Sequence, residues 1–219
     1  MLRMKSKPIS MKAKILVIGI LLLAGCSSTK LVNTWKNPDI VLFDAHKVLV
    51  VGMAQDENVR MEFESRLVDK LKEKQVEAMR GIDLFDVRFT SAQRSEEELA
   101  IVEQQLLDKD FDAILFTKVV GTENRRTLKE KVHNIDRMFK RFSTDYLEHQ
   151  DIYNDPESYD SFNIYHVETS LYCICDGKEM ELIWKGDLDV TETVKVDKTI
   201  DAYIKLITDK MGEQEIIFY

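Results

Sequence analysis

Residues 47–53 read Lys47-Val48-Leu49-Val50-Val51-Gly52-Met53, a nearly continuous apolar and β-branched run. Such a run is typical of a strand that is covered on both faces. Apolar residues then recur every four positions over 59–71, behind two residues that can cap a helix, Asp56 and Asn58. This stretch therefore predicts a buried strand followed by a helix that packs against it.

The same alternation continues through the first half of the chain. We expect a short strand at 76–79, a connection over 80–94, a helix that begins at the capping box Ser95-Glu96-Glu97-Glu98, and a second buried strand at 111–120. Together these segments predict a β-α-β-α-β layer.

The last third alternates with a period of two instead. Apolar residues fall at every second position around 164–175 and again around 180–190, and Asp176-Gly177 between them supplies a hairpin turn. An amphipathic helix is expected at 196–211. We therefore predict an α/β (α+β) fold: a single mixed β-sheet in the order β-α-β-α-β, then a β-hairpin, then a helix, with the helices packed on the sheet.

The N-terminus has the pattern of a secretory signal. Residues 1–14 carry five cations and no acid, and an apolar run over 15–24 is too short to span a membrane permanently. The following Leu23-Ala24-Gly25-Cys26 matches the lipobox of bacterial lipoproteins, which implies cleavage before Cys26 and lipid on its thiol. The alternative is a buried apolar N-terminal element with an incidental cysteine.

This resemblance divides the chain into three parts. Residues 1–25 are a lipoprotein signal peptide, 26–40 a lipidated tether whose apolar patch can add an edge strand, and 41–219 one α/β domain. Ser27 is not the Asp that tends to retain lipoproteins in the inner membrane, so we expect the periplasmic side of the outer membrane. The expected partners are the membrane itself and an envelope protein, and the covalent lipid on Cys26 takes the place of any cofactor.

The charge balance excludes general nucleic-acid binding. The whole chain of 219 residues has a net charge of −8, and removing the five signal-peptide cations leaves 26 Lys and Arg against 39 Asp and Glu, about −13. Phosphate backbones need a basic face, which this composition does not supply.

One inserted segment, at about 123–162, departs from this acidic background. Apolar residues recur there at helical spacing among five cations, Lys129, Lys131, Arg137, Lys140 and Arg141. Such a helix can contact anionic lipid or a partner, or it can lay its apolar stripe on the protein's own sheet, which we favour because both sheet faces need covering. An acidic loop is expected to follow over 145–160.

The remaining chemical candidates are weak. Cys173 and Cys175 are either a redox pair, half of a metal site or two core residues; we favour the core, because a strand rise puts them about 6.5 Å apart, near the upper limit for a disulfide. The four histidines are expected to be solvated or locally bonded. Residues 52–56 lie where α/β folds bind ligands, but one glycine makes no phosphate cradle, so we expect an ordinary connection.

A non-enzymatic binding or structural role follows, because no catalytic or metal-ligating motif is found. The alternative is a periplasmic ligand-binding domain or hydrolase with an unrecognised site. A deep polar pocket with converging carboxylates or histidines would favour this alternative.

Several segments carry a resemblance to a known family. These are the lipobox, Trp35-Lys36-Asn37-Pro38, Val48-Leu49-Val50-Val51-Gly52 with Asn58-Val59-Arg60 and Phe63-Glu64, and Val167-Glu168-Thr169-Ser170-Leu171-Tyr172 with Leu182-Ile183-Trp184-Lys185-Gly186. With them the chain resembles bacterial (Bacteroidetes-type) periplasmic or outer-membrane lipoproteins of unknown function. The resemblance implies a fold and an envelope location, and it brings no catalytic residues.

Overall fold

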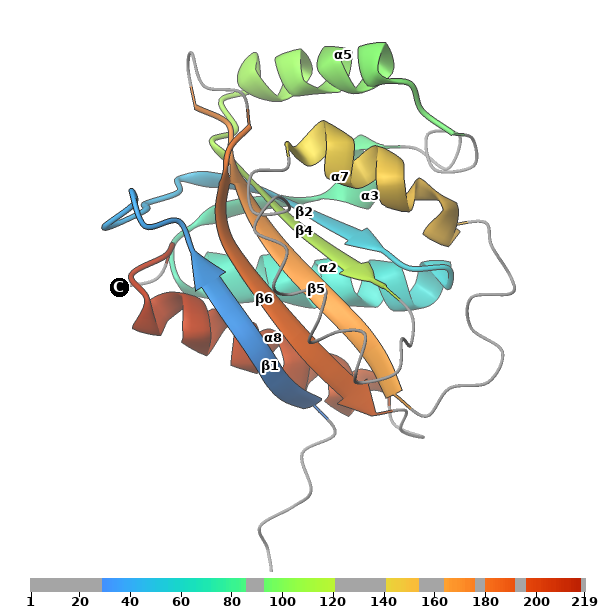
Figure 1. Ribbon diagram of the computed structural model, residues 1–219, viewed down its shortest axis with the longest axis vertical. Helices are drawn as coiled ribbons and strands as arrows, with labels where there is room; N and C mark the ends of the chain where they lie inside the picture. The colour runs from blue at the N-terminus through green and yellow to red at the C-terminus, as the bar shows by residue number, and fades with distance from the viewer. Residues whose placement is uncertain are drawn as a thin grey trace, which may run out of the picture.

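The fold is a six-stranded sheet with helices on both faces (Figure 1). The computed structural model describes residues 29–85, 93–120, 141–153, 164–175, 180–191 and 196–217. The strands are β1 (Thr29–Lys36), β2 (Lys47–Met53), β3 (Glu77–Arg80), β4 (Ala113–Val119), β5 (Ile164–Cys173) and β6 (Leu182–Thr191). The helices are α2 (Glu57–Glu73), α3 (Gly81–Leu84), α5 (Glu96–Leu107), α7 (Phe142–His149), α8 (Val196–Glu213) and the 3-10 helix η2 (Gln150–Tyr153).

The sheet is mixed, as the sequence predicts. Its strand order is β1-β6-β5-β4-β2-β3. β2 lies between β3 and β4 and is parallel to both, whereas β4, β5, β6 and β1 pair antiparallel in succession. The expected α/β (α+β) order of elements is confirmed. The expected connection over 80–94 differs in one respect, because it begins with the single turn of α3.

The sequence signals for helix starts are found in the structure. The Asp56 carboxylate accepts hydrogen bonds from the backbone N–H groups of Asn58 (2.8 Å) and Val59 (3.1 Å) at the start of α2. Ser95 and Glu98 form the predicted reciprocal capping box at the start of α5. Each cap satisfies backbone donors that the first turn leaves free, which fixes where the helix begins.

Two apolar cores lie on opposite faces of the sheet. α2 and α8 lie side by side on one face, where Leu67, Leu71 and Ile207 are buried against the sheet (Figure 1). α5 and α7 cover the other face, where Leu99 and Phe142 are buried. Apolar residues point to both faces of β2 and β4, which explains why their sequences are continuously apolar.

The described part of the inserted segment agrees with the favoured prediction for its apolar residues and differs from it at Asp145. Of the expected basic helix, residues 121–140 lie outside the described residues, while α7 covers Phe142 and Tyr146. Both rings are buried on the protein's own sheet, and Phe142 packs edge-on against Phe116 at 5.5 Å between ring centroids. Asp145, expected in an acidic loop, lies instead inside α7 and is buried, because it meets the buried cation Lys118.

The edge strand β1 starts close to the expected lipid attachment point. Thr29, three residues after Cys26, pairs with Val190 of β6, and the register runs on to Lys36 opposite Trp184. The apolar patch of the expected tether is therefore part of the sheet. Residues 1–28, which include the expected signal peptide and lipobox, lie outside the described residues.

Candidate functional site

A pocket of about 420 Å³ lies where β2 and β4 end and α2 begins. It is enclosed by side chains from the two strands, the start of β5, the end of β6 and the first turns of α2 and α8. Most of its wall is apolar, as in Val59, Phe63, Val119, Val167, Ile200 and Tyr203. The volume falls in the usual range of small-molecule sites, about 300–1,000 Å³.

Gly52 allows α2 to close over this strand end. A Cβ at position 52 would lie 3.3 Å from both Arg60 Cγ and Phe63 Cδ1, which is tighter than ordinary van der Waals contact. The glycine therefore lets the side chains of α2 pass close to the backbone of β2. The connection over 52–56, expected to be ordinary, forms one side of the pocket.

The polar groups on the pocket floor are satisfied by one another. Thr169 Oγ1 lies 2.8 Å from Thr117 Oγ1 and 2.6 Å from the Tyr203 hydroxyl. The Tyr203 ring packs edge-on against Phe63 of α2 at 5.9 Å between centroids. Burial raises the pKa of Tyr203, so its hydroxyl stays protonated and neutral. The floor therefore presents an uncharged surface to a ligand.

Arg60 and Glu64 lie one turn apart on α2 and are both buried beside the strand end. Glu64 accepts hydrogen bonds from the backbone N–H groups of Gly52 (2.8 Å) and Ile82 (2.9 Å), and burial raises its pKa. The Arg60 guanidinium lies 5.4 Å from the ring centroid of Tyr153. Its Nε has no hydrogen-bond partner among the described residues, although the side chain is only 5 % exposed.

The opposite face of the same strands carries a charged cluster, defined as Lys118, Asp145, Glu168, Lys185 and Asp187. Lys118 bonds to Asp145 and lies 2.7 Å from Glu168 Oε1. Lys185 lies 2.5 Å from Glu168 Oε2 and 3.7 Å from Asp187 Oδ1. Glu168 is the centre of the cluster because it sits opposite Lys118 in one strand register and opposite Asp187 in the next.

The pKa values in the charged cluster follow from burial and pairing. Burial opposes the ionisation of Asp145, but the hydrogen bond to His149 and the charge of Lys118 outweigh it and hold its pKa well below the usual range. The pKa of Glu168 is lowered against burial by Lys118 and Lys185. Burial raises the pKa of Asp187 to about 6, with only partial relief from Lys185. Two cations therefore balance two carboxylates, and the third acid holds its proton to a higher pH than an ordinary aspartate does.

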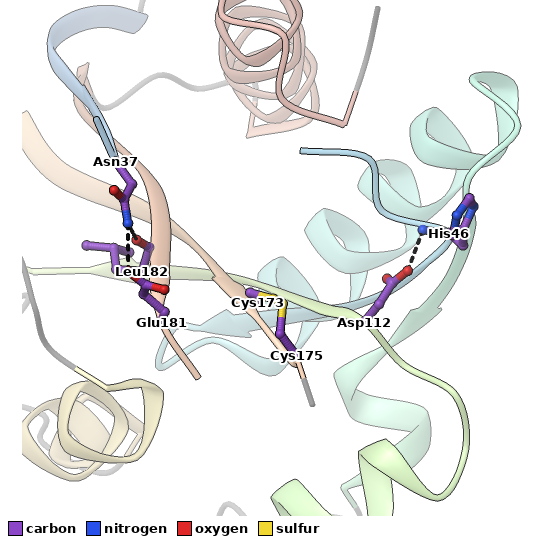
Figure 2. Close-up of a disulfide and its surroundings, with 7 residues drawn as sticks. All are labelled: Asn37, His46, Asp112, Cys173, Cys175, Glu181 and Leu182. Carbon is purple, nitrogen blue, oxygen red and sulfur yellow. Dashed lines mark hydrogen bonds between the residues drawn. A yellow bond between two sulfur atoms is a disulfide. The ribbon is translucent and has the colours of Figure 1, made fainter. Parts of the chain in front are cut away.

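The two cysteines form a disulfide instead of two separate core residues (Figure 2). Their Cα atoms are 5.4 Å apart, closer than along a regular strand, and β5 ends at Cys173. The N–H of the next residue, Ile174, is donated to Asp112 O. Cys173 is buried in the core as expected. Figure 2 shows the bond between the Asn37–Glu181 and His46–Asp112 contacts.

Most of the sequence-predicted site residues fall outside the described residues. These are Leu23, Ala24, Gly25 and Cys26 of the lipobox, and Lys129, Lys131, Arg137 and Lys140 of the basic segment. Arg141 is described and is the residue before α7, where its carbonyl accepts the N–H of Asp145 at 3.0 Å. Two of the histidines are locally bonded, His149 to Asp145 and His166 to Asp189.

The sequence analysis did not identify the charged cluster or Arg60, although each had a signal. Lys118 stands inside an apolar strand, and a buried lysine requires a counter-charge on a neighbouring element. Arg60 is one turn before Glu64 on the helix that follows β2, so both side chains face the end of that strand. In the described part of the chain, no group of three or more His, Cys, Asp or Glu side chains is placed to hold a metal ion.

Comparisons with known proteins give distant structural similarity only. No family model and no curated protein matches the chain. The PelC dodecamer from Paraburkholderia phytofirmans is similar with a TM-score of 0.43 and 10 % identity, over 86 % of this chain and 98 % of PelC. Lipoprotein GNA1162 from Neisseria meningitidis is similar with a TM-score of 0.39 and 12 % identity, over 76 % of this chain and 99 % of GNA1162. Similarity at this level transfers no function, and membership of a lipoprotein family stays a prediction.

Proposed function

We propose that this protein is a cell-envelope lipoprotein, held by lipid on Cys26 at the periplasmic face of the outer membrane, with a non-enzymatic binding or structural role. The observation that supports this most directly is the lipobox Leu23-Ala24-Gly25-Cys26 after a basic and apolar leader. The sheet begins close behind it. Thr29 is already paired with Val190, only three residues after Cys26. None of the described helices is long and apolar enough to cross a membrane.

The short distance to Cys26 determines how the domain would meet the membrane. Three extended residues reach at most about 10 Å, so a lipid on Cys26 holds the start of β1 within that distance of the bilayer surface. The end of β6 and the start of α8 lie at the same end of the sheet as Thr29 (Figure 1). The anchor would therefore turn the pocket end of the domain toward the lipid.

The ligand-binding alternative also gains support, and the hydrolase alternative does not. The described pocket has an apolar wall and a neutral, internally bonded floor, in contrast to the converging carboxylates or histidines that would favour hydrolysis. The charged cluster lies on the other face of the sheet, where its members pair with each other. Binding of an apolar ligand is the activity that this geometry supports.

Metabolic labelling with a palmitate analogue tests the anchor. Cells producing the wild type should yield labelled protein, and Cys26→Ala should yield none, while the control Cys175→Ala keeps the label. Equal labelling of the wild type and Cys26→Ala would overturn the anchor. Membrane fractionation tests the location. The wild type should fractionate with the outer membrane, and Ser27→Asp should move the protein to the inner membrane. Finding the wild type in the inner membrane would overturn that part of the proposal.

A further inference from the structure

We propose that the pocket binds an anionic amphiphile with one acyl chain, its tail against the apolar wall and its acidic head on Arg60. The shared chemistry is that of a fatty acid or an acidic lysophospholipid. This goes beyond attachment through Cys26, because the pocket is built from residues of the folded domain alone.

The wall of the pocket suits a hydrocarbon tail. Side chains from both α2 and α8 line it, and the apolar ones are Val59 and Phe63 of α2 and Val196, Ile200 and the Tyr203 ring of α8. Val196, at the first position of α8, lines the pocket and is 47 % exposed, so the apolar surface continues to the outside. Transfer of a chain from water to such a surface is favourable for every methylene buried.

Arg60 supplies the charged contact that an acidic head needs. The Arg60 side chain lines the pocket, and the residue is only 5 % exposed. Its Nε has no hydrogen-bond partner within the described ranges. A buried donor left unpaired is costly, which a bound anion would relieve. Guanidinium is also the side-chain group best matched to carboxylate and phosphate oxygens.

The acids near Arg60 are already engaged. Both oxygens of Glu64 accept backbone N–H groups, from Gly52 and Ile82. Asp56, which also lines the pocket, accepts the N–H groups of Asn58 and Val59 as the cap of α2. These contacts direct both carboxylates to the backbone. The charge of Arg60 still lowers the pKa of Glu64, but the Nε donor is left for a ligand.

The position in the fold gives independent support. The pocket lies at the carboxyl ends of the parallel strands β2 and β4. The helix after β2 packs on one face, whereas α7, which follows β4, packs on the other. Open α/β sheets bind ligands at such a switch point, where the chain leaves neighbouring strands in opposite directions.

Calorimetric titration tests the proposal on the chain from Ser27 onward, which retains all described residues and lacks the lipid attachment point. Saturated fatty acids of eight to eighteen carbons, kept below their micelle concentrations, should bind about fourfold tighter per added methylene until the pocket is full. The alcohol of equal length should bind at least about tenfold more weakly, because it cannot pair with Arg60. Absence of binding, or equal binding of acid and alcohol, would overturn the proposal.

Variants locate the ligand. Arg60→Met should remove the preference for the acid, and Arg66→Met, on the same helix but outside the pocket lining, should keep it. Val196→Asp, at an exposed position where the helix start tolerates an acid, should weaken the binding of fatty acids of every chain length. Unchanged binding in either pocket variant contradicts the assignment.

Lipid analysis of the chain purified from envelopes then separates fatty acid from lysophospholipid. Because this chain carries no Cys26, a failed titration leaves the anchor intact, and a failed labelling experiment leaves the pocket intact.

Discussion

Replacing Asp187 with Asn should stabilise the protein at neutral pH and change its stability little below pH 4. Asp187 is the third acid of the charged cluster, and its side chain is only 16 % exposed. Burial, opposed only in part by Lys185, raises its pKa from 3.8 to about 6. The folded protein therefore holds a proton on Asp187 more tightly than the unfolded chain does.

The sign and size of the effect follow from this difference in pKa. The stability that Asp187 contributes is fully present below about pH 4, where the acid is protonated in both states, and it is lost as the pH rises through 6. A pKa difference of about two corresponds to roughly 3 kcal/mol. Asn resembles the protonated acid at every pH, so the variant keeps this stability and should exceed the wild type by up to about 3 kcal/mol above pH 7.

Urea unfolding of both proteins between pH 4 and pH 8 measures the difference. Asp209→Asn is the control, because Asp209 is exposed and pairs with Lys205 on the surface of α8. Its effect should stay within about 1 kcal/mol at all pH values. A difference in the free energy of unfolding between wild type and Asp187→Asn that stays constant or becomes smaller as the pH rises would refute the argument. It would mean that Lys185 compensates for the burial of the Asp187 carboxylate.

Three further predictions concern stability. Asp145→Ala removes one partner of the buried Lys118 charge and should lower the free energy of unfolding by about 3–5 kcal/mol, measured by urea unfolding at pH 7. Gly186→Ala places a Cβ against the indole of Trp184 and should cost about 1–3 kcal/mol with a shift in tryptophan fluorescence. Reduction of Cys173–Cys175 should cost only about 1–2 kcal/mol, measured with and without reductant, because the bond closes a loop of three residues and so restricts the unfolded chain little.

The arrangement of elements was predictable because it depends on local periodicity. The continuous apolar run at 47–53, the cap Asp56 and the capping box at Ser95 each act within one element, and each appears where the sequence places it. The disulfide was not predictable from strand spacing, because the chain leaves the strand at Cys173. Local patterns thus give the elements, while the points where elements end depend on contacts across the fold.

The charged cluster could not be assembled from the sequence, since its members come together through strand register. Lys118 meets Glu168 because β4 and β5 pair at that position, and Asp187 reaches the same row through β6. A shift of one residue would send each of these side chains to the opposite face of its strand. The sequence carries the charges, but only the register makes them partners.

The alternation of these strands also separates the charged cluster from the pocket. Thr117 and Val167 line the pocket, while the next residue on each strand, Lys118 or Glu168, points to the other face. The sheet therefore lies between the charged cluster and a ligand beside Arg60. In addition, the lysines of the cluster neutralise most of the charge of its acids on that face. Variants of Asp187 should therefore alter stability without altering the preference of the pocket for an acidic head, whereas Arg60→Met should abolish that preference. Measuring both properties in both variants would reveal any coupling through the sheet.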